Sequence, residues 1–394
     1  MSNPVPDFQN TEIAFKHLKD SDLYRAWSLF RAINIKPFVT MGPALVTGAL
    51  KLRLPVKGLI KSTVFRQFCG GEDLESCEDT VRHLMLGGVY SILDYGVEGE
   101  KSEAGFDAAM AEVLRTVSAM KSNSGAPFCV FKLTALARFE LLEAVSTSGT
   151  STVHATLTAE WGRVVARVAK ICDTAITAGK LVMIDAEETW IQPAIDHLAI
   201  TMAREHNKKT AKVYTTIQMY RVNGLRDVNA LLDQARTEGW IPAIKLVRGA
   251  YMEIERERAR EMSYPSPIHP DKTATDIAYN EALKKILGPG STAFLCAGTH
   301  NADSSLLAVD LAEAYELPPA SPRMWFAQLL GMSDNLTFNL AHSGYLAAKY
   351  VPYGPIGAVL PYLFRRAREN TSIAGQSSRE LLLIERELRR RSGR

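Results

Sequence analysis

The chain has 394 residues, of which 46% are hydrophobic and 23% are charged. This composition is typical of a globular protein with a sizeable core, and the length allows one large domain or two small ones. The formal net charge of +3 is too small to indicate a nucleic-acid partner. No apolar run reaches the roughly 18 residues of a membrane-spanning helix, so the sequence predicts none.

The five cysteines are an odd number and show no C-x-x-C spacing. They indicate neither a zinc site nor a disulfide framework, so we predict no metal and a reducing compartment. Residues 1–15 resemble neither a secretory signal nor an arginine-rich transit peptide. We therefore expect a location in the bacterial cytoplasm or on the inner face of a membrane. The alternative is the matrix side of the mitochondrial inner membrane, for a chain whose leader has been removed.

Residues 1–75 are interpreted as an N-terminal helical arm. Between Leu23 and Gly71 the arm contains no acidic residue, and its basic residues are interleaved with apolar ones. These basic residues are Arg25, Arg31, Lys36, Lys51, Arg53, Lys57, Lys61 and Arg66. Such a segment either packs on the rest of the protein with its lysines extended to solvent, or lies on an anionic membrane surface. Binding to anionic vesicles at low salt distinguishes the two.

From residue 76 to residue 394 short apolar runs alternate with longer helical patterns, and we interpret this part as one domain. The runs with the length and composition of strands are 90–95, 128–133, 181–185, 213–218, 243–247, 293–297, 324–329 and 349–352. The helical patterns between them include 105–121, 156–178, 191–207, 228–237, 274–287 and 302–315. Apolar strands alternating with helices indicate parallel pairing that is covered on both faces.

Eight such units favour a closed (β/α)₈ barrel of the TIM type over an open doubly wound sheet. No G-x-G-x-x-G sequence follows the first predicted strand, which counts against a Rossmann domain.

Several polar residues stand at or near the carboxyl ends of the predicted strands, where a barrel of this type forms its active site. They are Lys132, Asp185, Gln218, Lys245, Arg248, His300 and Asn301. A charged side chain inside a barrel strand costs free energy unless it is paired or used. Lys132, Asp185 and Lys245 are therefore predicted to be functional, and the alternative is a set of structural salt bridges.

The segment 349–372 begins with an aromatic extended stretch, turns at Gly354-Pro355 and continues as a predicted helix over 356–370. On this helix Arg365 and Glu369 are four residues apart and share a face. With the adjacent Arg366 they form a basic fork suited to a carboxylate. The alternative is an ordinary solvated helix face with one ion pair.

The pattern Tyr-x-x-Arg-Arg-x-x-Glu-Asn, formed by Tyr362, Arg365, Arg366, Glu369 and Asn370, resembles the signature of proline dehydrogenases, which are FAD enzymes. Similar blocks recur in the same order from about Phe65 to Glu380, and they are most similar to the single-function, eukaryotic-type branch. The resemblance implies a distorted barrel in which the helix with the arginine pair, the last helix of the barrel, lies over the mouth. It also implies oxidation of L-proline to 1-pyrroline-5-carboxylate, the first step of proline catabolism, by hydride transfer to FAD.

The resemblance further implies roles for the substrate residues. Arg365 and Arg366, together with Lys132, would hold the proline carboxylate, and Glu369 would orient the fork. The ring would be enclosed by Tyr350, Leu329 and Tyr251. Asp185 would be an acidic residue essential to the site, through pairing with Lys132, and is not predicted to be the base.

The flavin residues are likewise implied by the resemblance. The segment Lys-Leu-Val-Arg-Gly-Ala-Tyr, 245–251, matches the strand-five motif of the family. Lys245 would lie near flavin N5, Arg248 would contact the pyrophosphate, and Gly249 would allow close approach of the cofactor. The remaining cofactor residues would be Gln218, Val247, Ala250, Lys272, Thr275, Asp276, Thr299, His300, Asn301 and Gln328.

The family passes its electrons to membrane quinone, so we expect a quinone partner and peripheral membrane contact. A hydroxyproline dehydrogenase is the close alternative, and the bulk of Tyr350 argues against a hydroxylated ring. A non-catalytic membrane-surface module is the alternative from another class. The final stretch, 379–394, is predicted to be a docking helix with a solvated basic tail, or a second membrane contact.

Overall fold

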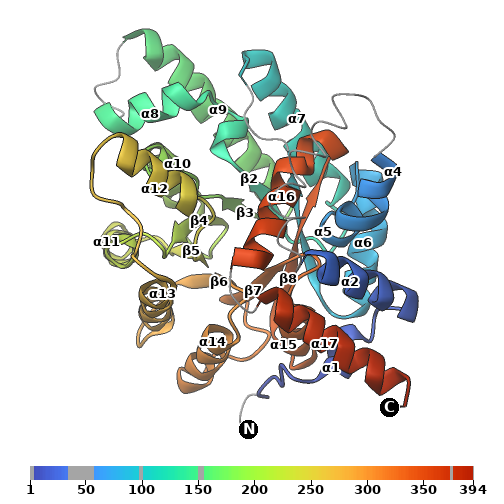
Figure 1. The fold of residues 1–394 in the computed structure, drawn as a ribbon. Helices are drawn as coiled ribbons and strands as arrows, with labels where there is room; N and C mark the ends of the chain where they lie inside the picture. The colour runs from blue at the N-terminus through green and yellow to red at the C-terminus, as the bar shows by residue number, and fades with distance from the viewer. Residues whose placement is uncertain (1–3, 34–56, 97–100, 150–154, 373–375, 394) are drawn as a thin grey trace. The chain divides into compact units, whose positions relative to one another are not determined.

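The computed structural model describes residues 4–33, 57–96, 101–149, 155–372 and 376–393. Within these ranges the side chains of 155–156, 367–372 and 376–378 are not described. The predicted strands form a closed barrel in chain order, β1 to β8, as the ribbon in Figure 1 shows. The adjacent strands whose registers are established all pair in parallel. The prediction of a (β/α)₈ barrel is therefore confirmed.

The strands are β1 Tyr90–Tyr95, β2 Phe128–Phe131, β3 Leu181–Ile184, β4 Val213–Gln218, β5 Ala243–Val247, β6 Phe294–Gly298, β7 Met324–Leu329 and β8 Leu346–Tyr353. The bounds of β1, β4, β5 and β7 agree with the prediction at both ends. Strand β2 ends earlier than predicted because Lys132 is the N-cap of a 3₁₀ turn, Leu133–Ala135. Strand β8 begins earlier than predicted, at Leu346, and its Ala348, a poor strand former by composition, pairs with Tyr90 of β1.

The chain forms two compact units, and each is described here by itself. Unit 1 contains residues 97–327 with the short segments 1–5 and 344–346, and unit 2 contains residues 6–96, 328–343 and 347–394.

Unit 1 holds strands β2 to β6 and most of β7. Its helices are α7 Glu103–Ala119, α8 Phe139–Ser148, α9 Ala155–Thr177, α10 Gln192–His206, α11 Gly224–Glu238, α12 Met252–Glu261, α13 Lys272–Leu287 and α14 Ala302–Ala314. A large core joins β2, β3 and β4 to the apolar faces of α7 to α10. Phe128 on β2 contacts Tyr214 on β4 and Trp325 on β7, in both cases edge to face.

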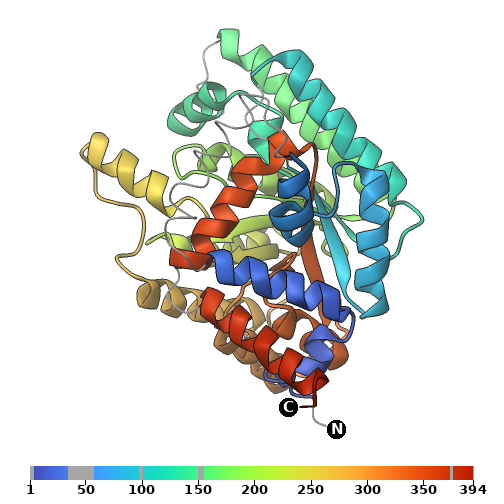
Figure 2. The same ribbon diagram turned by 45° about the vertical axis from the view of Figure 1, so that its right-hand side comes forward.

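Unit 2 holds β1, β8 and the helices from both ends of the chain. Its helical segments are α1 Thr11–Phe15, α2 Asp20–Ile33, α4 Lys57–Ile60, η1 Lys61–Phe65, α5 Arg66–Phe68, α6 Leu74–Leu86, α15 Asp334–His342, α16 Ile356–Ser372 and α17 Gln376–Arg391. Helix α17 lies alongside α2, as Figures 1 and 2 both show. A second core joins α16 to these two helices through Val359, Leu363, Phe30 and Ile384.

The basic terminal segments are described in part. Lys36, Lys51 and Arg53 of the N-terminal arm lie outside the described residues. In α17 the expected solvated tail is wrong for Arg391, whose guanidinium pairs with Glu387 at 2.7 Å and Asp20 at 2.8 Å. This arginine attaches α17 to the start of α2. Among the helices that the structure describes, none is long and apolar enough to cross a membrane.

All five cysteines are free and buried. Burial raises the pKa of the Cys77, Cys129 and Cys296 thiols to about 12. Burial also raises the pKa of Cys69 and Cys172 far above its ordinary value. These thiols are therefore inert packing groups in the folded protein.

Candidate active site

Charged side chains from β3 and β5 meet inside unit 1. The Nζ atom of Lys245 lies 2.6 Å from Oδ1 of Asp185, and the two side chains are only 8% and 11% exposed. Sequence analysis expected Lys132 as the partner of Asp185, and the structure adds this pair with Lys245. A buried ion pair is seldom more stabilising than apolar residues of the same size. Its presence near the strand ends therefore indicates a functional role.

The loop after β3 is tied to the ends of two neighbouring strands by Glu187. Its buried carboxylate accepts hydrogen bonds from the backbone N–H of Thr134, at 3.0 Å, and from the Thr134 hydroxyl. Its carbonyl oxygen accepts a bond of 2.7 Å from the amide of Gln218. Burial raises the pKa of Glu187 to about 7, against the opposing effects of the Thr134 bonds and the charge of Lys132.

Sequence analysis missed Glu187. The only signal for it was an acidic residue two positions beyond Asp185. Its partner Thr134 follows Lys132 by two residues, so the contact holds the backbone next to a predicted substrate ligand.

Arg248, at the carboxyl end of β5, is fixed by three side chains. It donates to Asp276 at 2.7 Å, to the Thr299 hydroxyl at 2.5 Å and to the Ser304 hydroxyl at 2.9 Å. Its guanidinium also lies 4.4 Å from the centre of the Tyr279 ring. The structure therefore brings together three residues predicted for the nucleotide, Arg248, Asp276 and Thr299.

The other predicted residues around this cluster have mixed surroundings. Lys272 is exposed and pairs with Asp276, and Thr275 is buried one turn of α13 further on. Asn301 caps α14 by accepting from the backbone N–H of Ser304 at 2.9 Å. His300, which lies between Thr299 and Asn301 in the sequence, is half-buried. The Asn301 side chain thus has a structural task that sequence analysis did not consider.

The backbone after β5 requires glycine. Gly249 has a φ of +133°, and a Cβ atom there would lie 2.5 Å from the ring of Tyr220. Val247 is half-buried and Ala250 is exposed, while the N–H of Ala250 approaches the Gln218 side chain at 3.4 Å. Tyr251 follows as the N-cap residue of α12 and is half-buried.

In unit 2 the arginine pair lies on the predicted helix, α16. Arg366 is only 7% exposed, and its guanidinium lies 5.1 Å from the centre of the Tyr362 ring. Arg365 is half-buried, and the side chain of Glu369 lies outside the described residues. A solvated basic face is therefore a wrong description of Arg366.

The predicted pocket residues of unit 2 lie on β7 and β8. Tyr350 is 8% exposed on β8, and Leu329 is half-buried at the end of β7. The backbone N–H of Leu330 donates to the Tyr350 carbonyl at 3.0 Å, which links the two segments. Gln328 is buried and accepts a bond of 2.8 Å from the Thr337 hydroxyl.

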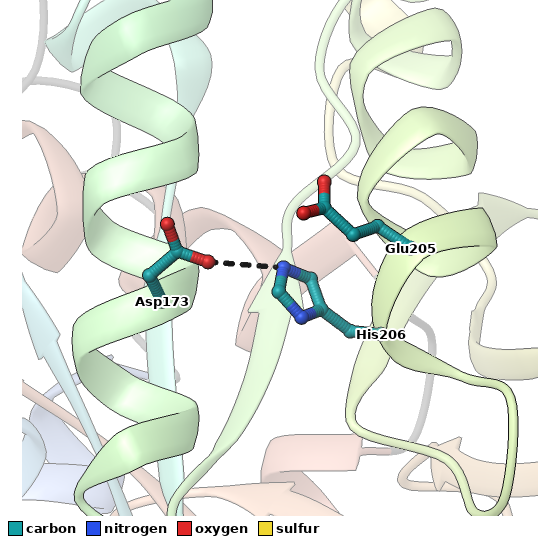
Figure 3. A group of neighbouring side chains, drawn as sticks. All are labelled: Asp173, Glu205 and His206. Carbon is teal, nitrogen blue, oxygen red and sulfur yellow. Dashed lines mark ion pairs between the residues drawn. The ribbon is translucent and has the colours of Figure 1, made fainter.

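A second group of ionisable side chains lies elsewhere in unit 1, between α9 and α10. Figure 3 shows Asp173, Glu205 and His206, whose potential ligand atoms all lie within 4.8 Å of one another. The two residues joined in the figure, Asp173 and His206, are an ion pair of 3.3 Å. Since these helix ends lead into the amino ends of the strands, the group is distant from Asp185 and Gln218. A surface ion pair accounts for it, and the two carboxylates are exposed.

A closed parallel barrel with buried charges at its strand ends is the architecture of enzymes whose active sites form at that end. The sequence profile described as proline dehydrogenase matches residues 77–379. The chain therefore belongs to the proline dehydrogenase family.

Individual relatives agree. The chain is 32% identical over 430 residues to mitochondrial proline dehydrogenase 1 of Arabidopsis thaliana, covering 98% of this chain and 86% of that protein. It is 34% identical over 335 residues to the carbapenem antibiotics biosynthesis protein CarD of Pectobacterium carotovorum, covering 85% and 86%. The human mitochondrial proline dehydrogenase 1 is 40% identical over 232 residues, which is 58% of this chain and 39% of that protein.

Among solved structures, proline utilization A of Bdellovibrio bacteriovorus, inactivated by N-propargylglycine, superposes with a TM-score of 0.70 at 19% identity. The match covers 92% of this chain and 38% of that much longer protein. This likeness supports the fold alone.

Proposed function

We propose that this protein oxidises L-proline to 1-pyrroline-5-carboxylate with bound FAD and passes the electrons to a quinone. Family membership supports the substrate class. The observation on which the proposal chiefly depends is the burial of Arg366 against Tyr362, inside the Tyr-x-x-Arg-Arg pattern. The planar N–H groups of a guanidinium held in this way suit the two oxygens of a substrate carboxylate.

The donors around β5 suit a dinucleotide. Lys245 is buried and offers a cation, and Arg248, held by its hydrogen bonds, offers a ligand for phosphate. Gly249, with its positive φ, allows the backbone to approach the cofactor closely. Lys245, Arg248, Gly249 and Gln218 would hold the cofactor. FAD, when bound, supplies the acceptor for the hydride that leaves the ring carbon next to the proline nitrogen.

The remaining work falls to binding and orientation. We assign Arg365 and Arg366 to the substrate carboxylate, because paired planar guanidiniums match its two oxygens. Lys132, in unit 1, is proposed as a further substrate-binding cation. Arg366 is held against Tyr362, so part of its rotamer entropy is already lost before the substrate binds.

Asp185 is proposed to orient the ammonium of Lys245. Its Oδ1 atom is committed to the lysine ammonium at 2.6 Å, so it is poorly placed to accept a proton from the substrate. The proline amine must therefore arrive without its extra proton. Loss of the hydride from carbon and the N–H proton then leaves the C=N bond of the product.

The test is spectroscopic and kinetic. The purified protein should be yellow, should bleach when L-proline is added without oxygen, and should reduce a soluble quinone analogue in the presence of proline. A colourless protein that binds no FAD, or a yellow one that proline does not bleach, would contradict the proposal. Membrane contact is proposed through the basic segment 23–71, and sedimentation with anionic vesicles at low salt checks it.

A further inference from the structure

The loop between β7 and α15, residues 329–334, is held by a buried lysine. The Nζ atom of Lys349 donates to the carbonyl of Met332 at 2.5 Å and of Leu329 at 3.4 Å, and it pairs with Asp334 Oδ1 at 2.7 Å. The lysine side chain is only 1% exposed. One ammonium thus fixes the first residue of the loop and the residue that begins the next helix.

A carboxylate from α17 holds the same loop from another side. Glu380 accepts the backbone N–H of Ser333 at 2.7 Å and its hydroxyl at 3.3 Å, and both residues are buried. Ser333 has a φ of +52°, which is unfavourable for a residue with a side chain. The hydrogen bonds from Ser333 to Glu380 therefore stabilise the positive φ of Ser333.

The remaining loop residues are fixed as well. The Gln67 side chain donates to the Gly331 carbonyl at 3.0 Å, and the N–H of Leu330 donates to Tyr350 at 3.0 Å. A Cβ atom on Gly331 would lie 2.1 Å from the Gln67 carbonyl oxygen. The loop backbone is consequently held at every residue from Leu329 to Ser333.

Burying the charges of Lys349 and Glu380 costs free energy of desolvation, which suggests that these contacts do more than stabilise the fold. A buried lysine–carboxylate pair is usually no more stabilising than apolar side chains of equal volume. Lys349 and Tyr350 are neighbours on β8, so their side chains point to opposite faces of the strand. The Lys349 side chain therefore lies on the face of β8 opposite to Tyr350, which is one predicted wall of the proline pocket. Its ammonium donates to the backbone carbonyl of Leu329, which is the other predicted wall.

We infer that Lys349 and Glu380 are positioning residues that set the spacing between Tyr350 and Leu329, and so determine which ring fits. The inference rests on the proposed function and extends it, because it gives α17, which has no predicted substrate ligand, a part in substrate choice. Neither residue touches the substrate. Each acts through the loop of residues 329–334.

The first variant for the test is the double substitution Lys349→Met with Asp334→Asn, which removes both charges and keeps the volume. We expect kcat/KM for L-proline to fall about 10-fold, mainly through KM, because the pocket walls shift by a fraction of an ångström. The ratio of kcat/KM for L-proline to that for 4-hydroxy-L-proline should narrow about 5-fold, because a looser pocket discriminates less between rings of different size.

The second test uses Glu380 and its conservative variant. Glu380→Leu leaves the Ser333 N–H without its acceptor and should narrow the ratio of kcat/KM for L-proline to that for 4-hydroxy-L-proline. Glu380→Gln keeps an acceptor oxygen and should leave this ratio unchanged. Glu385, also on α17, contacts Trp27 at 3.1 Å instead of the loop. Glu385→Leu is the matched control, which should lower the melting temperature without changing the ratio.

The outcomes separate the two proposals. Wild-type protein that does not oxidise proline overturns the proposed function and this inference together. Wild-type protein that does, with folded Lys349 and Glu380 variants of unchanged ratio, overturns the inference alone. A Glu385→Leu protein that changes the ratio as much as Glu380→Leu also overturns it, because the effect would then belong to α17 in general.

Discussion

Two barrel strands in different parts of the molecule each bury a lysine beside a carboxylate. On β5, Lys245 pairs with Asp185 at 2.6 Å. On β8, Lys349 pairs with Asp334 at 2.7 Å and also donates to two backbone carbonyls of one loop. Burial beside a carboxylate therefore does not by itself assign a role to a lysine. The backbone acceptors of Lys349 identify it as a lysine that organises a loop, whereas the proposed role of Lys245 depends on its place at the strand ends.

The largest expected effect concerns stability at β8. Lys349→Met leaves Asp334, whose side chain is 15% exposed, without its ammonium, which should lower the free energy of unfolding by about 3–5 kcal/mol. Adding Asp334→Asn should restore most of the loss, because no unpaired charge remains. Urea unfolding of the single and double variants measures this, and a single variant as stable as the wild type would show that the pair is not buried in solution.

On β5 the corresponding substitution should act on the rate. With Lys245 in its proposed place near the flavin, Lys245→Met is expected to lower kcat for proline by about 10²–10³-fold, because a cation near the developing charge is lost. Stopped-flow reduction under anaerobic conditions measures the step directly. A rate within threefold of the wild type would mean that β5, like β8, uses its lysine only for structure.

Two buried carboxyls, one in each unit, predict a pH dependence of stability. Burial raises the pKa of Glu187 and of Glu380 to about 7, and Asp334 adds to the effect at Glu380. The folded protein then binds more protons than the unfolded chain between the ordinary carboxyl pKa of about 4.5 and pH 7, so each group lowers stability as pH rises through that window. Above pH 7 the penalty is constant, at about 3 kcal/mol for each group.

Glu187→Gln and Glu380→Gln should each remove one such penalty, so each variant should gain stability relative to the wild type from pH 5 to pH 7. Chemical unfolding at several pH values measures the difference. His17 acts in the opposite direction, because burial lowers its pKa to about 4, and comparison with the wild type cancels its contribution. Glu253→Gln, at an exposed carboxylate, is the control and should show no such gain.

The arginine fork of unit 2 should show its role in binding. Arg366→Ala is expected to raise KM for proline about 10²-fold, since a charge-assisted bond to the carboxylate is worth a few kcal/mol. Arg366→Lys should restore only part of the loss, because an ammonium cannot bind both oxygens in one plane. Steady-state kinetics with both variants checks this. An unchanged KM for proline would show that Arg366 does not bind the substrate carboxylate.

The smallest expected effect is at Tyr350. Tyr350→Ser should bring the kcat/KM values for L-proline and 4-hydroxy-L-proline several-fold closer, because a smaller side chain leaves room for the ring hydroxyl. Parallel assays with the two substrates measure it. Equal turnover of both substrates by the wild-type protein would contradict a steric role for this tyrosine.

The barrel was predictable because its strands are nearly uninterrupted apolar runs and its longer helices have clear periodicity. Helix α12 was missed because its sequence, MEIERERARE, is mostly charged and offers no apolar face to recognise. Helix α8 was missed although its sequence contains three buried apolar residues, because the stretch is short and begins only four residues after the 3₁₀ turn that follows β2.

The candidate site was predictable where a charge interrupts a strand or follows its end, as at Lys245 and Asp185. Lys349 did not meet this criterion, because it stood at the first position of the predicted strand, 349–352. It lies inside the strand only because β8 begins at Leu346. Its partners were beyond prediction. Asp334 follows Ser333, whose positive φ the sequence does not announce, and Glu380 comes from α17, 47 residues further along the chain than Ser333.

The five buried thiols have a practical consequence. Because burial keeps all of them protonated at neutral pH, maleimide reagents should leave the native chain unlabelled over ordinary reaction times. A single cysteine introduced at an exposed position, such as Lys272 or Glu253, would then carry a fluorophore or spin label without first removing the natural ones. Movements around the strand ends during turnover could therefore be followed in a protein whose interior has not been altered.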